Sequence, residues 1–179
     1  MRQTRSRRQR PSNERFRDRL KANTDAGTIH DRDIRYLMIR PDSLMGLFRI
    51  LDPGKRELAL GAFSDSVKMH GKNSAESYQQ PDVSEAGSLL TSISETASQL
   101  GWGRWSFDTD FENQILNLTV GNSPFVEGFG PSNTTVCAPI VGMIAGVAEL
   151  IFGKDAEGRE NRCAACGDEH CLFEARAES

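Results

Sequence analysis

Three of the chain's four cysteines, Cys163, Cys166 and Cys171, lie within nine positions near the C-terminus. The Cys-x-x-Cys spacing of the first two is the one with which a tight turn presents two sulfurs to one tetrahedral metal ion, and Cys171 is close enough to add a third. The fourth ligand has to come from elsewhere. Cys137 is a candidate because it stands at the start of a predicted helix, whose dipole lowers the pKa of a thiol and favours the thiolate. The cysteines therefore predict a metal site that fixes this helix to the C-terminal strands.

Two other side chains compete for the fourth position, Glu160 and His170. Residue types and spacing leave open a four-cysteine set and a set in which Glu160 replaces Cys166. Zinc suits both sets, because it binds thiolate, imidazole and carboxylate at about 2.0–2.3 Å. The simpler alternative is a group of free thiols in a turn. A catalytic cysteine is less favoured, because no motif places a histidine beside it as a base.

The length and hydropathy predict one folded domain with a tail. The chain has 179 residues, 37% of them hydrophobic, and no apolar run approaches the roughly 20 residues of a membrane-spanning helix. The basic N-terminus is not followed by the apolar stretch of a secretory signal. We therefore expect a cytoplasmic protein without a membrane span, and in that compartment clustered cysteines are more often metal ligands or catalytic thiols than disulfides.

Charge is divided unevenly along the chain. Residues 1–21 hold nine lysines and arginines against two acidic residues, which leaves 13 basic and 23 acidic residues for the rest. An acidic body argues against a nucleic-acid-binding domain, although the basic segment could contact nucleic acid, an anionic membrane or an acidic protein. We predict that residues 1–33 form a basic, partly disordered arm and that residues 34–179 form the folded domain.

Apolar periodicity places helices and strands in separate blocks. Residues 23–33 are expected to be a linker, and residues 121–135 a loop or a broken short helix. Helices are predicted over residues 41–51, 55–71, 84–101 and 136–153, and strands over residues 34–40, 104–111 and 114–120, with two short strands within 158–178. This order predicts the α+β class, with an antiparallel sheet of about four or five strands and helices packed against it.

The C-terminal half also carries an ordered signature: a cysteine that opens a glycine-containing helix, then Glu-x-x-Cys, a glycine and Cys-x-Phe. The residues that fit it are Cys137, Glu160, Cys163, Gly167, Cys171 and Phe173. From roughly Leu100 to Ala175 the chain thereby resembles the 4-vinyl reductase domain family. That family includes a bacteriochlorophyll-biosynthesis protein, small archaeal proteins and the sensor domains of phenol- and xylene-responsive transcription regulators.

The resemblance implies a ligand set, a fold and an oligomeric state. In the phenol sensors the corresponding Cys, Glu, Cys and Cys hold zinc. By analogy the implied ligands are Cys137, Glu160, Cys163 and Cys171, which leaves Cys166 as a spare thiol. The implied fold is shared with subunits of the TRAPP transport particle and is usually found as a homodimer.

A zinc ion with four protein ligands has no open position for water, so the predicted site stabilises structure and catalyses nothing. Function is then expected in an apolar pocket between the helix 138–152 and the sheet, which would bind a hydrophobic small molecule, aromatic or tetrapyrrole, as a sensor or carrier. The candidate lining residues are Trp102, Trp105, Phe107, Phe125, Phe129, Ile144 and Val147. The simpler interpretation is that these side chains are ordinary core.

Two other functions remain open, an assembly scaffold and an accessory protein or reductase that acts on a vinyl tetrapyrrole in bacteriochlorophyll biosynthesis. A reductase is disfavoured because "GWGRW" lacks the third glycine of a dinucleotide-binding loop and precedes a strand. His70 is a candidate polar anchor or haem ligand. Gly142 and Gly146, one helical turn apart, permit close packing within the chain or against a second subunit.

Overall fold

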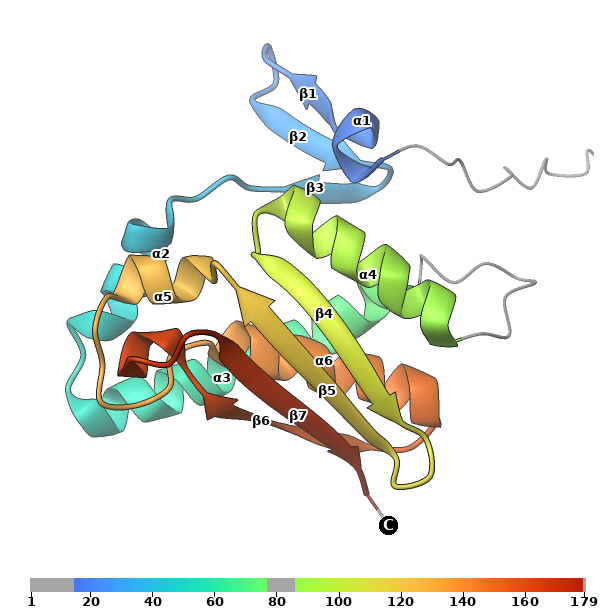
Figure 1. Cartoon of the computed structure of the whole chain (residues 1–179). Coiled ribbons are helices and arrows are strands. Elements are labelled where there is room, and N and C mark those ends of the chain that lie inside the picture. The colour runs from blue at the N-terminus through green and yellow to red at the C-terminus, as the bar shows by residue number, and fades with distance from the viewer. Residues whose placement is uncertain (1–14, 77–85, 179) are drawn as a thin grey trace, which may run out of the picture.

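A four-stranded antiparallel sheet forms the centre of the protein (Figure 1). The structure is a computed structural model and describes residues 15–76 and 86–178. The strands are β4 (Arg104–Asp110), β5 (Ile115–Gly121), β6 (Ala156–Arg162) and β7 (Cys171–Ala177), in the order β4-β5-β7-β6. Each neighbouring pair is antiparallel. The predicted α+β class with an antiparallel sheet is confirmed.

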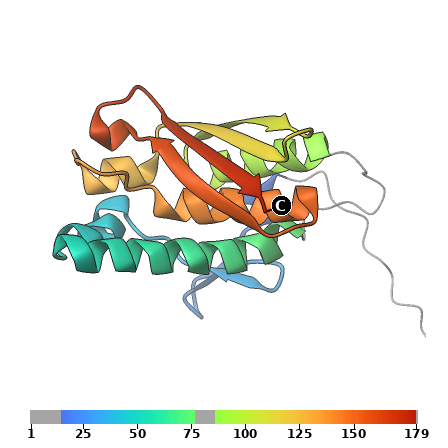
Figure 2. The ribbon, with the colours of Figure 1, turned by 90° about the horizontal axis from the view of Figure 1, so that it is seen from below.

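Helix α6 (Ala138–Phe152) lies between the sheet and helix α3 (Pro53–Glu76), so that the three form successive layers (Figure 2). Neighbours on both sides explain why α6 is apolar nearly all round. The side chains of Ile140, Ile144 and Val147 are fully buried in this interior. The alternating buried residues of β5 complete the core from the sheet side.

Gly142 lets α6 and α3 approach each other closely. A Cβ atom at this position would lie 2.0 Å from the backbone oxygen of Ser64 in α3, so any larger residue forces the helices apart. Of the two alternatives that the sequence left open for this glycine, the structure shows packing within the chain.

Helix α4 (Ala86–Leu100) leads into β4 and packs beside that strand at the edge of the sheet. Two shorter helices, α2 (Pro41–Arg49) and α5 (Pro124–Phe129), lie against each other at one end of the molecule (Figure 1). α5 falls within residues 121–135, where a loop or a broken short helix was predicted.

The N-terminal module, residues 15–36, is the largest departure from the sequence prediction. It contains helix α1 (Phe16–Arg19) and a small antiparallel sheet of β1 (Lys21–Asn23), β2 (Thr28–Asp31) and β3 (Ile34–Tyr36). The expected linker at residues 23–33 is therefore a hairpin turn and a strand. These strands have three or four residues and lack an alternating buried face, so no apolar period marks them. Residues 1–14, the rest of the predicted arm, lie outside the described residues.

Other boundaries differ by a few residues. The strand predicted over 34–40 ends at Tyr36, and the helix predicted to break near Gly71 continues to Glu76. Helix α6 begins at Ala138, directly after its N-cap residue Cys137. Within the described ranges, no helix combines the length and the apolar character needed to cross a membrane.

Candidate metal centre and ligand cavity

Four potential metal ligands converge where α6 begins beside the hairpin of β6 and β7. Cys137 is the N-cap residue of α6, and Glu160 lies in β6. Cys163 follows that strand, and Cys171 is the first residue of β7. One ligand atom from each of these residues lies within 4.8 Å of the other three, and all three cysteines are buried. The structure thus brings together the four residues that the resemblance implied.

The spacing of the donor atoms fits one tetrahedral ion. The Sγ atoms of Cys137 and Cys171 are 3.8 Å apart, and two thiolates on a tetrahedral ion with bonds of about 2.3 Å are also about 3.8 Å apart. Oε2 of Glu160 accepts a hydrogen bond from the backbone N–H of Cys137 at 2.9 Å. Its other oxygen, Oε1, is buried without a hydrogen-bond partner among the described residues. A cation within the cluster would give that oxygen the partner it lacks.

Backbone hydrogen bonds hold the cysteine turn in place. The turn is the short 3-10 helix η1 (Ala164–Cys166). The N–H of Cys163 donates to Oδ2 of Asp168 at 3.0 Å, and the N–H of Ala164 donates to Sγ of Cys171 at 3.3 Å. Because a hydrogen bond to sulfur favours the thiolate, the second contact also supports metal binding.

The cluster concentrates acidic groups in a buried space. Burial, followed by the hydrogen bond and charge of Cys163, raises the pKa of Glu160 to about 8. Hydrogen bonds with Cys163 and Cys171, together with burial, raise the pKa of Cys137 above its usual range. Cys163 is the exception, because the thiols of Cys137 and Cys171 donate to its sulfur and lower its pKa. The site therefore tolerates little negative charge unless a cation balances it.

The two competing ligands lie outside the cluster. Cys166 is exposed, and burial of its sulfur followed by the negative charges of Cys163 and Glu160 raises the pKa of this thiol. His170 is partly exposed, and its Nδ1 lies 2.7 Å from the backbone oxygen of Glu169. Of the two ligand sets that spacing left open, the geometry favours the one that contains Glu160.

An apolar cavity of about 270 Å³ lies among α3, α4, α6 and the start of β4. Trp102 and Trp105, the only tryptophans in the sequence, are both in its wall. The indole N–H of Trp105 donates to the backbone oxygen of Trp102 at 3.0 Å, and the two ring centroids are 6.3 Å apart. This bond satisfies the polar atom of Trp105 and fixes the two residues relative to each other.

The predicted lining residues separate into three groups. Trp102 and Trp105 line the cavity, and Phe129 lines a groove described below. Among the described residues of these walls, neither space includes the other four, which are Phe107, Phe125, Ile144 and Val147. The space between α6 and the sheet, where the pocket was expected, is filled by buried core side chains, whereas the cavity lies toward α3 and α4.

Sequence reasoning missed the share of α3 and α4 in the cavity wall. Val67 and His70 of α3 lie there, as do Ile93 and Ala97 of α4. Each pair has helical spacing, so each marks one face of its helix. The sequence carries no signal that these two faces meet.

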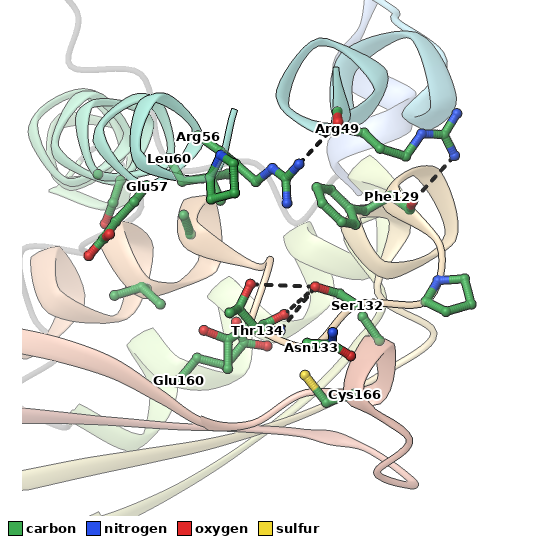
Figure 3. A pocket seen from close by; sticks show the side chains of 18 of the residues that line it. Arg49, Arg56, Glu57, Leu60, Phe129, Ser132, Asn133, Thr134, Glu160 and Cys166 are labelled. Carbon is green, nitrogen blue, oxygen red and sulfur yellow. Dashed lines mark hydrogen bonds between the residues drawn. The ribbon is translucent and has the colours of Figure 1, made fainter. Parts of the chain in front are cut away.

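A groove of about 1200 Å³ lies beside the metal cluster (Figure 3). Glu160 and Cys166 lie on one side of it, and Arg49 and Arg56 on the other. Arg56 donates to three backbone oxygens of residues 48–51, and its guanidinium carbon is 5.4 Å from the centroid of the Phe129 ring. Arg49 donates to the backbone oxygen of Phe129 at 3.4 Å. Both arginines thus connect the end of α2 to its neighbours, and we assign this groove no ligand.

The sheet, its two helix layers and the cysteine turn define an α+β domain with a buried site for a metal ion. The family model of the 4-vinyl reductase domain matches residues 116–177, which include all four clustered residues. This segment of the chain is a 4-vinyl reductase domain, which confirms the resemblance drawn from the sequence. No curated protein matches the chain.

Three solved structures share the fold. The phenol-responsive sensory domain of the transcription activator PoxR, solved with phenol, matches with a TM-score of 0.74 and 20% identity over 90% of this chain and 86% of that one. A vinyl-4-reductase family protein from Methanocaldococcus jannaschii gives 0.50 and 15% over 80% and 98%. Subunit 3 of a trafficking protein particle complex from Naegleria fowleri, covalently bound to palmitic acid, gives 0.53 and 12% over 78% and 95%. At these identities the likeness establishes the fold alone.

Proposed function

We propose that this protein is a small-molecule-binding member of the 4-vinyl reductase domain family, a sensor or carrier, which holds an aromatic ligand in the cavity beside Trp102 and Trp105. The observation that carries the proposal is the cavity itself, because apolar cavities with a few polar groups at their edge are the usual sites for small ligands. Thr96 and His70 supply polar atoms in this wall. No catalytic group is assigned to the protein.

The volume of the cavity limits the size of the ligand. About 270 Å³ is slightly below the range of about 300–1,000 Å³ that encloses drug-sized molecules. One aromatic ring, or two fused rings, suits this space better than a tetrapyrrole. The phenol in the structure of the PoxR sensory domain supports the same ligand class.

We further propose that the ion of the cysteine cluster is zinc. Three thiolates and one carboxylate are zinc donors, and four protein ligands complete a tetrahedral shell. A shell without an open position gives the ion a structural role, which is to connect the start of α6 to the β6–β7 hairpin. The four side chains would hold the ion, and elemental analysis of the purified protein tests its identity.

Titration with phenol and indole tests the ligand proposal. We expect saturable heat by calorimetry, accompanied by a change in the emission of the two cavity tryptophans. Ala97→Leu should fill part of the cavity and raise the Kd of indole by at least about tenfold. Ala62→Leu, at an exposed position of α3, is the matched control and should bind indole like the wild type. The ligand proposal fails if neither compound binds the wild type, or if both variants bind equally well.

Self-association as a homodimer and a cytoplasmic location stay predictions from the sequence. Light scattering after size-exclusion chromatography tests the first directly. A dimer would run at twice the mass of 19.8 kDa that the chain has.

A further inference from the structure

One wall of the ligand cavity comes from the N-terminal module. Tyr36 lines the cavity, although it is the last residue of β3 and belongs to that module. The rest of the wall is supplied by α3, α4, α6 and the start of β4. A molecule in the cavity would therefore contact two parts of the chain that are joined only through residues 37–40.

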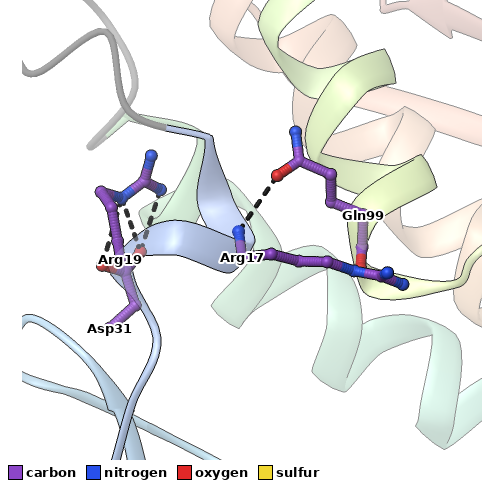
Figure 4. Close-up of polar contacts among 4 residues, drawn as sticks. All are labelled: Arg17, Arg19, Asp31 and Gln99. Atoms are coloured by element: carbon purple, nitrogen blue, oxygen red, sulfur yellow. Dashed lines mark hydrogen bonds and ion pairs between the residues drawn. The ribbon is translucent and has the colours of Figure 1, made fainter.

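Tyr36 is firmly connected to the rest of its module. The ring of Phe16 packs edge-on against it, with centroids 5.2 Å apart, and Phe16 is only 2% exposed. Arg19 of α1 forms a half-buried ion pair with Asp31 of β2, in which Nη2 lies 3.0 Å from Oδ2 (Figure 4). These contacts make α1 and the small sheet one unit, so a displacement of α1 displaces Tyr36 as well.

The module contacts the body at the end of α4. The backbone N–H of Arg17 donates to Oε1 of Gln99 at 3.0 Å, and Nε of Arg17 donates to the backbone oxygen of Gln99 at 2.7 Å (Figure 4). Leu100, the next residue, lines the cavity. The contact that holds the module in place and the wall of the cavity are thus adjacent on the same helix end.

The remaining connection is an extended, exposed segment. Residues 37–40 lie in neither a helix nor a strand, and the side chains of Leu37 and Met38 are each 82% exposed. The hydrogen bonds between Arg17 and Gln99 are also exposed, and bonds of this kind contribute little to stability by themselves. Docking of the module is therefore easier to change than the fold of the body.

We infer that Tyr36 closes the ligand cavity, so that binding of an aromatic molecule and docking of the N-terminal module stabilise each other. The inference rests on the proposed ligand cavity and names the element that its occupancy would regulate. Coupling of this kind is reciprocal: a ligand that contacts Tyr36 strengthens docking, and any change that weakens docking weakens ligand binding by the same factor. The module would thereby report whether the cavity is filled.

Hydrogen–deuterium exchange of the full chain, with indole as the probe, tests this coupling. Saturating indole should slow exchange in residues 15–36, and not only in the α3 and α4 segments that line the cavity. Gln99→Ala removes a docking contact without touching the cavity wall and should raise the Kd of indole about two- to tenfold. Gln114→Ala is the matched control, because Gln114 accepts its hydrogen bond from Lys154 in another part of the surface. It should leave the Kd unchanged.

Tyr36→Ala provides a second readout. In this variant we expect weaker binding of indole and no protection of residues 15–36. If indole binds the wild type but leaves the exchange of residues 15–36 unaltered, or if Gln99→Ala binds indole as tightly as wild type, the coupling is refuted while the ligand cavity stands. If indole and phenol do not bind at all, the cavity proposal fails and the coupling falls with it.

Discussion

The carboxylate of Glu160 in β6 accepts a hydrogen bond from the backbone N–H of Cys137, with 2.9 Å between Oε2 and the nitrogen. This bond satisfies one of the N–H groups at the start of α6 and holds the helix against the strand. The second oxygen, Oε1, stays without a partner among the described residues. Glu160 therefore links strand and helix directly, and it is also positioned to act as a metal ligand. A cysteine at residue 160 could not accept this backbone bond equally well, because sulfur is a weak acceptor.

Loss of a clustered cysteine should remove the metal. Cys171→Ser is expected to abolish stoichiometric zinc and to lower Tm by about 10 °C, because loss of a structural metal belongs to the most destabilising class of substitution. Elemental analysis and thermal unfolding measure the two effects. Cys166→Ser, at the exposed cysteine, should keep both the zinc and the Tm. Loss of zinc in Cys166→Ser with full retention in Glu160→Gln would show that the ligand set is wrong.

Glu160 should release a proton when the ion binds. Its pKa of about 8 in the metal-free site means that it is mostly protonated at pH 7 and has to ionise to act as a ligand. Zinc titrated into metal-free Glu160→Gln should therefore release about one proton fewer than in the wild type. Calorimetry in buffers of different ionisation enthalpy counts the protons. Above the raised pKa the wild-type carboxylate is already ionised, so the difference should vanish near pH 9.5, and a constant difference would contradict the assignment.

Close contact of two helices should make Gly142 intolerant of any side chain. Gly142→Ala places a methyl group against the backbone of Ser64, and overpacking of this kind costs about 1–3 kcal/mol of unfolding free energy. Gly61→Ala in α3 is the control, since its added methyl meets nothing within 4 Å and should stabilise the helix by up to about 1 kcal/mol. Urea denaturation compares the two. Equal stability of both variants would be inconsistent with the described packing of α6 on α3.

Gly71 should set the size limit of the ligand cavity. A methyl group here would lie 2.8 Å from Cε of Met143, a flexible side chain that also lines the cavity and would have to shift. Gly71→Ala is expected to weaken binding of two-ring indole several-fold more than binding of one-ring phenol. Calorimetric Kd values for both compounds give the ratio, with Gly61→Ala as the reference. An unchanged ratio would exclude Met143 as the limiting wall.

The metal cluster was predictable because its signals are local. Cys163 and Cys171 belong to one turn, and Cys137 precedes a helix that apolar residues mark clearly. Spacing alone left Glu160 and Cys166 undecided, because either could reach the ion from the same hairpin. The resemblance favoured Glu160, and the structure places this side chain in the cluster.

The cavity was less predictable because it depends on which surfaces meet. Ile144 and Val147 belong to a helix that is apolar on all sides, so the sequence could not show that they face a filled core. Tyr36 was out of reach for a different reason. It ends a three-residue strand whose side chains are not buried, and the small sheet exists through pairing between short segments that leave no periodic trace.

The donors of the metal site come from positions 137, 160, 163 and 171, with all of α6 and β6 between the first and the last. A nascent chain therefore lacks a complete coordination shell until synthesis has passed residue 171, eight residues before the last one of the sequence. Capture of the ion belongs to the end of folding, after the hairpin has met the start of the helix. Metal scarcity would thus leave a chain whose helices and sheet have formed but whose C-terminal turn is still unfastened.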